Sequence, residues 1–600
     1  MSHRLFGSLK LRVALTLVAG LIGLTVLAAG PAAAATLPNF TSHSINVLPI
    51  NQAKFWAGQK FDFEVEAKEL GTVKNIQVLL NGTPAEKFFG KAPVVKLDPG
   101  VSSYRINQVA FAKAEPVNII VNVLTAQGAA SRELKYNVVA DKAPKQAKNV
   151  ILFVGDGMSL QARQMARILS KGITEGKYKG LLEMENMSNL ALITTSGYDS
   201  LVTDSANSAS AYATGHKSVV NAMGVYENAT ADPMDDPKVE NIIEMAKRVR
   251  GMSTGIVSTA NITDATPAAM VAHTRRRSEQ NAIAASMLDP EHRPDVILGG
   301  GSQHFLPKSV PGSKRTDERN LVEEFKSQGY AFAGNKTELN KLQNPSKVLG
   351  LFQLDNLNVY IDREVTKNPA VLGSFTDQPT LMDLTKLAIN TLSKNPNGFF
   401  LMVEGASIDK QLHTVDWERA TYDTIEMDKS IGIAKEFAKK NQDTLIIVVA
   451  DHAHSASITG TYHELDGKTG RQAVRTYAAA GFPTFKDKNG DGFPDDPAPE
   501  VTLAIHYANH PDYNEDYKFN PQPIAPAIAA DGKTIANPKK DAGSDQYNGN
   551  IPYSETQEVH TADDVPLTAD GPGAEYFRGV MDNTEVFYGM VRSLGLDAVK

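Results

Sequence analysis

The sequence predicts an α/β fold: a three-layer sandwich with a large, mainly parallel central sheet, preceded by a small all-β sandwich domain. Continuous apolar runs recur after residue 148, and they predict strands that are buried on both faces. Helical patterns near these runs, at 239–250, 380–394 and 416–440, predict the helical layers. Alternation of apolar and polar residues before residue 140 predicts the small sandwich.

Composition and charge limit the classes of protein to consider. The chain has 600 residues, 42% of them hydrophobic and 22% charged, as is typical of a soluble globular protein with two or more domains. It has no long basic block, so we expect no nucleic-acid partner. It has no cysteine, so core burial or metal ions must supply what disulfide bonds would give.

Residues 1–35 have the pattern of a secretory signal peptide. Basic residues precede a long uncharged apolar run, and the small residues of PAAAAT then offer a cleavage site before Thr36. The basic residues are Arg4, Lys10 and Arg12. Losing these three would change the formal charge from −7 to −10. We therefore predict a periplasmic or secreted protein without a membrane span after cleavage; an uncleaved membrane anchor is the alternative.

Residues 36–147 are predicted to form the small sandwich, with an immunoglobulin-like architecture. Phe61, Phe63 and Val65 alternate with acidic residues, and the same period recurs in later segments. Asn81-Gly82 is a hairpin turn signal. We expect the polar faces of these strands to point outward, a linker at 140–148, and a structural or substrate-docking role.

In the α/β domain, 148–600, polar residues follow four of the apolar runs. These residues are Asp156, Asp264, Glu404, and Asp451 with His452. Because ligands bind at the carboxyl ends of parallel strands, we expect these side chains to meet there. Between about 455 and 555 the chain is rich in Pro, Gly, Asn and Asp, which predicts a surface insertion.

The stretch VEGASIDKQLH has the spacing of a metal site. Asp409 and His413 are four residues apart and share one face of a helix, where a carboxylate and an imidazole suit a zinc-like ion. A solvated helix with a chance histidine is the alternative. In ADHAH, Asp451 and His452 can reach one cation only where the backbone turns, and we expect His454 to support the ligands from behind or to lie at the surface.

The stretch VTDSANSASAYATG raises the question whether Ser205 caps a helix or is a nucleophile. Asp204 is a suitable N-cap for the small residues that follow.

Further along, Asp264 and Thr266 share a face if extended, or form a turn and an N-cap before Pro267. Three consecutive arginines, Arg275, Arg276 and Arg277, follow. One guanidinium can hold two oxygens of a phosphate or sulfate, and we expect the other two to be surface charges.

Together these motifs resemble the bacterial alkaline phosphatase family. DSANSASAYATG is similar to the family's nucleophile signature. The blocks ILFVGDGM, DATPAAMVAH, VEGASIDKQLH, ADHAH and EVHTADDVPL match its other blocks in order. The resemblance covers roughly 148–600 and leaves out 36–147. It implies a hydrolase of phosphate monoesters that forms a phosphoserine intermediate and releases phosphate and an alcohol.

The resemblance also implies the roles of individual residues. Ser205 would be the nucleophile, Arg277 would bind phosphate, and Lys410 would reach phosphate through water, although Arg275 and Arg276 leave the choice of arginine open. The ligands of one zinc would be Asp409, His413 and His560. The ligands of the second zinc, beside Ser205, would be Asp156, Asp451 and His452. The third site, usually magnesium, would involve Asp156, Asp264, Thr266 and Glu404.

Two other functions stay open at this point. A phosphodiesterase or sulfatase on a related scaffold is one, but Ser205, Thr266 and Glu404 favour monoesters. A catalytically inactive, metal-bound surface or adhesion protein is the other. A homodimer is compatible with the sequence and is not tested by it. The missing cysteines depart from family members that carry disulfides.

The stretch DKNGDGFPDD resembles the start of a calcium loop. Oxygen-bearing residues alternate around Gly492; they are Asp487, Asn489, Asp491 and Asp495. Ala498 stands where such loops carry a bidentate Glu. We predict calcium binding that orders the insertion; a plain acidic turn is the alternative.

Overall fold

The computed structural model describes residues 44–174, 177–414, 416–458 and 557–596, with short pieces at 461–462, 474–475, 505–507, 527–528 and 534–535. The predicted signal peptide lies outside the described residues. So does the predicted calcium loop with Asp487, Asn489, Asp491 and Asp495. Within the described part of the chain, no helix is both long and apolar enough to cross a membrane.

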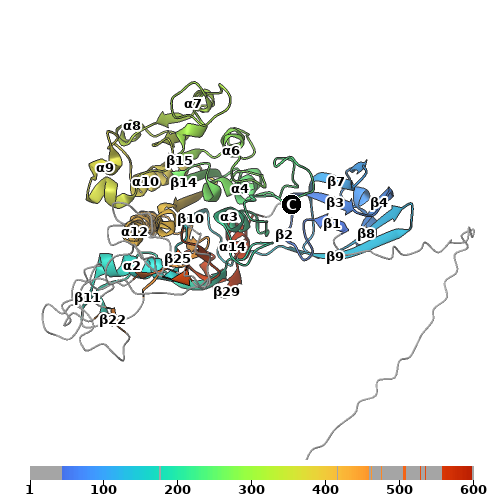
Figure 1. Ribbon diagram of the computed structural model, residues 1–600, viewed down its shortest axis with the longest axis horizontal. Helices are drawn as coiled ribbons and strands as arrows, with labels where there is room; N and C mark the ends of the chain where they lie inside the picture. The colour runs from blue at the N-terminus through green and yellow to red at the C-terminus, as the bar shows by residue number, and fades with distance from the viewer. Residues whose placement is uncertain are drawn as a thin grey trace, which may run out of the picture.

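Two small sheets form the N-terminal sandwich, in blue in Figure 1, as predicted. One sheet has the order β1-β3-β7-β6, with strands β1 (Ile45–Leu48), β3 (Lys60–Lys68), β7 (Val101–Ala110) and β6 (Val94–Leu97). The other has the order β2-β9-β8-β4-β5, with strands β2 (Lys54–Trp56), β9 (Ala129–Val139), β8 (Pro116–Thr125), β4 (Val73–Leu80) and β5 (Thr83–Pro84). Helix α1 (Ala85–Phe88) follows β5. Asn81 and Gly82 have φ values of 47° and 79°, as the predicted hairpin turn requires.

The polar face of β3 is buried, which corrects the expectation that it points outward. Asp62, Glu64 and Glu66 are each 4% exposed or less. The segment 227–239 of the α/β domain covers them, and Arg105 pairs with Asp62 at 3.0 Å and with Glu64 at 3.2 Å. The alternating pattern is that of a strand, but a local pattern cannot reveal that a distant segment covers its polar face.

A ten-stranded, mainly parallel sheet forms the centre of the second domain, as predicted. Its order is β16 (Ala331–Ala333), β17 (Val348–Leu351), β15 (Val296–Gly300), β14 (Ser253–Asn261), β18 (Phe399–Gly405), β10 (Asn149–Gly155), β19 (Thr444–Ala450), β28 (Val565–Asp570), β13 (Asn189–Thr194) and β29 (Gly579–Asp582). Within this sheet β28 is antiparallel to both of its neighbours, β19 and β13. The two middle strands β18 and β10 are buried along their whole length.

Helices cover both faces of this sheet (Figure 1), which gives the predicted three layers. They are α2 (Leu160–Lys171), α3 (Ser205–Thr214), α4 (Ile242–Arg250), α5 (Ala265–Ala269), α6 (Gln280–Ser286), α7 (Leu321–Ser327), α8 (Lys336–Lys341), α9 (Pro369–Leu372), α10 (Leu381–Leu392), α11 (Ser407–His413), α12 (Trp417–Lys440) and α14 (Glu585–Leu594). In Figure 1, α2, α10 and α12 lie on one side of the sheet, and α3, α4 and α14 on the other. The helices predicted at 239–250, 380–394 and 416–440 are confirmed as α4, α10 and α12.

Smaller elements complete the described structure. They are η1 (Ser302–His304), η2 (Ile361–Val365), η5 (Ala574–Tyr576), and the two-stranded pairs β11 (Ile173–Thr174) with β12 (Lys177–Tyr178), β20 (Ala453–His454) with β27 (His560–Thr561), β21 (Ser457–Ile458) with β24 (Ile505–His506), β22 (Thr461–Tyr462) with β23 (Val474–Arg475), and β25 (Ala527–Ile528) with β26 (Thr534–Ile535).

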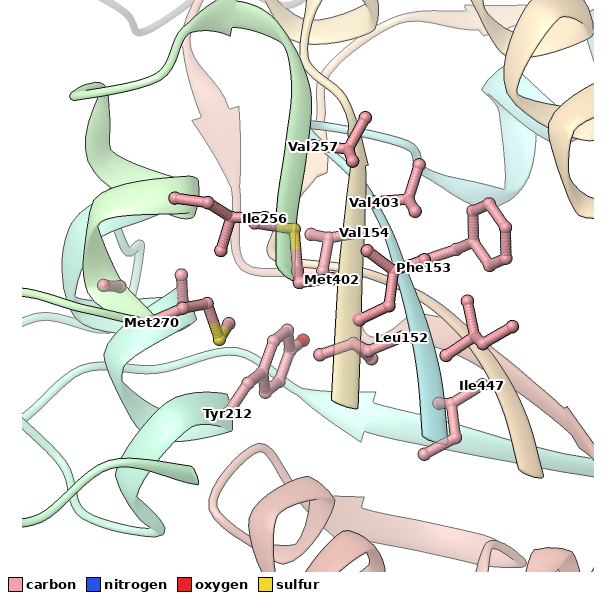
Figure 2. Close-up of a cluster of buried hydrophobic side chains, with 14 of the residues drawn as sticks. Leu152, Phe153, Val154, Tyr212, Ile256, Val257, Met270, Met402, Val403 and Ile447 are labelled. Carbon is pink, nitrogen blue, oxygen red and sulfur yellow. The ribbon is translucent and has the colours of Figure 1, made fainter. Parts of the chain in front are cut away.

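Apolar side chains fix the strands against the helices. Figure 2 shows Leu152 and Val154 of β10 beside Met402 of β18, with Tyr212 of α3 and Met270 packed near them. All five are fully buried. Because burial of each large apolar side chain contributes about 1.5–3 kcal/mol, this core holds the strand ends rigidly in place.

Candidate active site and metal centre

Ser205 is the first residue of α3 and is 4% exposed. Asp204 is the N-cap of the helix, and its side chain accepts a hydrogen bond from the backbone N–H of Asn207 at 3.1 Å. The Ser205 hydroxyl lies 3.2 Å from His452 Nε2 and 3.4 Å from Asp156 Oδ1. The capping role therefore belongs to Asp204, and the Ser205 hydroxyl faces the predicted ligands.

Two hydroxyl groups fasten α3 to the end of β19. Tyr212 donates a hydrogen bond to the Ala450 carbonyl at 2.5 Å, and Ser208 donates one to the Asp451 carbonyl. Because both side chains are buried, these contacts are shielded from competing water. They fix Ser205 relative to Asp451 and His452.

Asp156 follows β10, and Gly157 makes the turn after it. Gly157 has φ +61°, and a Cβ there would lie 2.9 Å from Asp409 Oδ1. Its backbone N–H donates to Asp451 Oδ1 at 3.0 Å. Glycine at this position therefore lets two carboxylates from distant segments, Asp409 of α11 and Asp451 after β19, approach this turn.

Asp451 and His452 directly follow β19, where the backbone bends. Such a bend is what the prediction that both residues reach one cation requires. His452 Nε2 lies 3.4 Å from Asp451 Oδ2 and 3.3 Å from Asp156 Oδ1. Asp451 Oδ2 is buried and has no hydrogen-bond partner. Burial, together with the charges of Asp156 and Asp409, raises the pKa of Asp451 well above its usual value. A nearby cation would relieve this repulsion.

A second group of ligand atoms surrounds Asp409. His413 Nε2 lies 3.3 Å from Asp409 Oδ2, across one turn of α11, and His560 Nε2 lies 3.5 Å from Asp409 Oδ1. The Nδ1 atoms of the two imidazoles contact backbone carbonyls, His413 that of Glu558 at 2.6 Å and His560 that of Thr203 at 2.8 Å. Such contacts fix the tautomer that offers Nε2 to a metal.

Charge in this second group also favours a cation. The Nε2 atoms of His413 and His560 lie 3.0 Å apart, and Asp409 Oδ1 is buried without a hydrogen-bond partner. Burial opposes a charged imidazole, but Asp409 outweighs it and raises the pKa of His413 to about 9. A divalent cation that replaces the proton would satisfy all three groups at once.

His454 is buried, so the surface position offered for it in the sequence is wrong. It is 1% exposed, and its Nε2 lies 3.8 Å from Asp409 Oδ1 and lacks a hydrogen-bond partner. Its strand β20 pairs with β27, which carries His560. His454 thus belongs to the Asp409 group of potential metal ligands.

Glu404 and Thr266 lie at the ends of neighbouring elements. Glu404, in β18, is 1% exposed and accepts a hydrogen bond from Ser258. Its pKa is raised well above the usual value by burial and by the negative charge of Asp156. Thr266, in α5, is 1% exposed, and its hydroxyl has no hydrogen-bond partner. An uncompensated carboxylate and an unsatisfied hydroxyl fit oxygen ligands of a hard cation.

Asp264 has partners that the sequence does not reveal. It is the N-cap of α5, as the alternative interpretation of this stretch has it. Its Oδ1 accepts from Arg277 Nη2 at 2.9 Å, and its Oδ2 accepts from Lys410 Nζ at 2.7 Å. Arg277 also reaches Asp204 at 3.3 Å. Arg277 therefore links Asp264 to the N-cap of α3, next to Ser205, and Lys410 holds the other oxygen of Asp264.

Only one of the three consecutive arginines is a surface charge, whereas two are expected from the sequence. Arg276 is exposed, but Arg275 is 6% exposed and pairs with the buried Asp236 at 3.1 Å. Arg275 also donates to the Thr230 carbonyl at 2.5 Å. It therefore fastens the segment 227–239, while Arg277 points toward the Ser205 group.

The comparison with known proteins agrees with this geometry. The family model described as alkaline phosphatase matches residues 147–596. The chain belongs to the alkaline phosphatase family. It is thus a hydrolase of phosphoric monoesters. The predicted resemblance is confirmed.

Individual relatives cover most of this alkaline phosphatase. Alkaline phosphatase 4 of Bacillus subtilis is 34% identical over 476 residues, which are 78% of this chain and 93% of the relative. Alkaline phosphatase of Escherichia coli is 31% identical, over 79% of this chain and 92% of the relative. The solved cold-active alkaline phosphatase of Shewanella sp. is 27% identical, with a TM-score of 0.51 over 74% of this chain and 99% of that chain.

Sequence reasoning missed three parts of this phosphatase. It did not predict the ion pairs of Asp264, the burial of His454, or a further group made of Glu244, His273 and His292. His273 stands at the start of the stretch HTRRR and is the part of the last group nearest to a motif that the sequence singles out. Its partners come from segments that no spacing rule connects.

Proposed function

We propose that this alkaline phosphatase hydrolyses phosphate monoesters by a metal-dependent route through a phosphoserine at Ser205. The observation that carries the proposal is the position of the Ser205 hydroxyl, at the N-terminus of α3 and within 3.4 Å of both Asp156 and His452. A free serine hydroxyl is a weak nucleophile, and nearby divalent cations activate it.

Three metal positions follow from the ligand groups. Asp409, His413 and His560 would hold one zinc, and Asp156, Asp451 and His452 would hold a second one beside Ser205. Glu404, Thr266 and Asp156 would hold magnesium. Bound dications lower the pKa of a hydroxyl and stabilise negative charge on attacking and leaving oxygens.

The oxygen-rich third position has a parallel among the solved structures. A TAB5 alkaline phosphatase variant, 25% identical to this chain with a TM-score of 0.50 over 75% of it, has magnesium bound in its M3 site. In this chain both oxygens of Asp264 are engaged by Arg277 and Lys410, so we expect Asp264 to position these two side chains rather than to bind the third metal directly.

The protein's own side chains perform the transfer. The Ser205 hydroxyl gives up its proton and its oxygen attacks phosphorus; the bond from phosphorus to the ester oxygen breaks, and that oxygen takes up a proton and leaves as the alcohol. Arg277 holds two non-bridging oxygens, and the free N–H groups at the start of α3 add positive partial charge there. Lys410 reaches the same phosphate through water. Water then hydrolyses the phosphoserine and restores Ser205.

The proposal extends to the setting of the enzyme. The pattern of residues 1–35 supports export to the periplasm or the medium. We infer domains at 36–147 and 148–600, with the insertion at about 455–555 and a calcium ion at Asp487, Asn489, Asp491 and Asp495. A homodimer is compatible with this arrangement, and sedimentation of the full chain would test it.

Ser205→Ala tests the nucleophile. We expect turnover of nitrophenyl phosphate to be abolished while the metal content of the purified protein persists, because the ligands remain. The same preparations are assayed on the diester and sulfate counterparts. Retained turnover in Ser205→Ala would refute the assignment, and a preference for the diester or sulfate would refute the proposed substrate class.

A further inference from the structure

A second group of metal-ligating side chains lies apart from the Ser205 site. It consists of Glu244 on α4, His273 after α5 and His292 after α6, and its ligand atoms all lie within 4.8 Å of one another. His273 Nε2 is 3.1 Å from Glu244 Oε1, and His292 Nδ1 is 2.7 Å from the same oxygen. The side chains are 3% to 12% exposed, so the group is shielded from solvent.

The surroundings hold each of these side chains in place. His273 Nδ1 lies 2.9 Å from the Gly224 carbonyl, a contact that leaves Nε2 free to accept a cation. A Cβ at Gly224 would lie 2.6 Å from His273 Nδ1, so glycine at 224 leaves room for the imidazole ring. Glu244 Oε2 accepts the capping hydrogen bond from the Asn241 N–H at 2.8 Å and also lies 3.1 Å from His273 Nε2, while Oε1 faces both histidines.

The loop that carries His292 is fixed as well. Lys247 Nζ donates to the carbonyls of Pro290 at 2.9 Å and Arg293 at 2.5 Å. His292 Nδ1 is buried and, despite its short distance to Glu244, makes no hydrogen bond with suitable alignment. His292 Nδ1 and Glu244 Oε1 thus belong to one group of side chains that could hold a metal ion.

We propose that Glu244, His273 and His292 bind a zinc-class divalent cation that is separate from the catalytic metals. Two imidazoles and one carboxylate are an established zinc ligand set with one open coordination position. Ligands at 2.0–2.1 Å from a tetrahedral ion lie about 3.3 Å apart, so outward movements of a few tenths of an ångström admit it. This site does not depend on the proposed function of the Ser205 group.

The three side chains line a groove of about 490 Å³ between the sandwich and the α/β domain. Its lining also includes Lys60, Lys238, Lys247 and Arg248 beside Glu240 and Glu291, and Arg248 pairs with Glu240 at 2.5 Å. A water or a small anion would reach the ion from this groove as the fourth ligand. The ion would join α4, the segment before Arg277 and the loop after α6, and so would act as a staple in a protein that has no cysteine.

Metal counting on the full-length holoprotein tests the proposal. Glu244→Gln keeps the capping hydrogen bond, because Gln also fits a capping box, but a neutral amide is a poor zinc ligand. We expect Glu244→Gln and His292→Ala to lose one zinc per chain after dialysis against zinc, and the control His304→Ala to lose none. His304 is 9% exposed and contacts Asn281 outside this group. Equal zinc counts in the three variants and the unmodified protein would overturn the proposal.

Anomalous scattering at the zinc edge gives an answer that does not depend on variants. In crystals of the unmodified protein grown with zinc, we expect a peak between Glu244, His273 and His292, besides peaks at the Ser205 site. A peak at the Ser205 site alone would overturn this inference and leave the proposed function intact. A peak between Glu244, His273 and His292 alone would support this inference and contradict the proposed metals at the Ser205 site.

Discussion

At the scale of single residues, Asp264 joins Arg277 and Lys410, the two cations that we propose to bind the phosphate. Its carboxylate is partly buried, which would raise its pKa, but Lys410 and Arg277 outweigh this desolvation and hold the pKa well below its usual range. Asp264 is therefore ionised at any working pH. Its charge orients Arg277 and Lys410, and it compensates them while no phosphate is bound.

Asp264→Asn should lower kcat/KM for nitrophenyl phosphate about 10- to 100-fold, the usual cost of removing a residue that orients active-site groups. An amide offers no negative charge to hold the two cations. Steady-state kinetics with a phosphate inhibition series measures the effect. The matched control is Asp317→Asn, which breaks the pair with Arg315 elsewhere in the domain. Equal kinetics in the two variants would contradict the role of Asp264.

At the scale of elements, the turn after β10 brings the carboxylates together. Gly157→Ala places a methyl group 2.9 Å from Asp409 Oδ1 and strains a residue with φ +61°. Since a displacement of about 1 Å can cost about 100-fold in rate, we expect a loss of that order in kcat and a lower metal content. Activity and metal analysis of the purified variant check both effects.

Gly579→Ala is the control for backbone strain. Gly579 in β29 has φ +69°, but nothing lies within 4 Å of a Cβ there. We expect this variant to lose some stability and to keep its kcat and metal content. If Gly157→Ala kept its kcat and metal content as Gly579→Ala does, the predicted clash between a Cβ at 157 and Asp409 would be wrong.

The sequence predicts these elements well where a local pattern decides them. The apolar runs of β10, β18 and β19 indicate buried parallel strands, and the spacing of Asp409 and His413 predicts their shared face. It does not predict that β28 inserts antiparallel between β19 and β13, because pairing over such separations depends on the whole packed domain. The burial of His454 follows from another long-range pairing, that of β20 with β27, and so escapes local analysis.

At the scale of the whole molecule, the sandwich is joined to the α/β domain by buried polar contacts. Trp56 Nε1 donates to the Leu596 carbonyl at 2.8 Å, and Gln59 Nε2 donates to the Thr214 carbonyl, at the end of α3, at 2.8 Å. In Figure 1, α14 lies on the side of the α/β domain that faces the sandwich. The sandwich therefore contacts the helix that carries Ser205. This contact favours a structural role for the sandwich over a role that is separate from the α/β domain.

The junction should depend on pH through Glu64. Burial raises the pKa of Glu64 from 4.5 to about 7, in spite of the Arg105 guanidinium. A raised carboxyl pKa means that ionisation of Glu64 destabilises the folded state. The contribution of protonated Glu64 to the free energy of unfolding is therefore fully present below pH 4.5 and is lost as pH rises through 7. Glu64→Gln should then stabilise the protein at pH 8 by about 1–3 kcal/mol, since one pKa unit corresponds to about 1.4 kcal/mol.

Calorimetric melting of Glu64→Gln and the unmodified protein at pH 4 and pH 8 measures this difference. The Tm gain should appear at pH 8 and vanish at pH 4. Glu133→Gln, an exposed glutamate on β9, is the control and should show no dependence on pH. A larger gain at pH 4 than at pH 8 would show that the sign of the Glu64 contribution is wrong.

Trapping of the phosphorylated enzyme tests the central claim most directly. The protein is mixed with nitrophenyl phosphate, quenched in acid and digested, and the peptide that contains DSANSASAYATG is sequenced by mass spectrometry. The account predicts one phosphate, carried by Ser205, and its disappearance after chelation of the metals. Phosphate on another residue of that peptide, or turnover without any phosphorylated peptide, would contradict it.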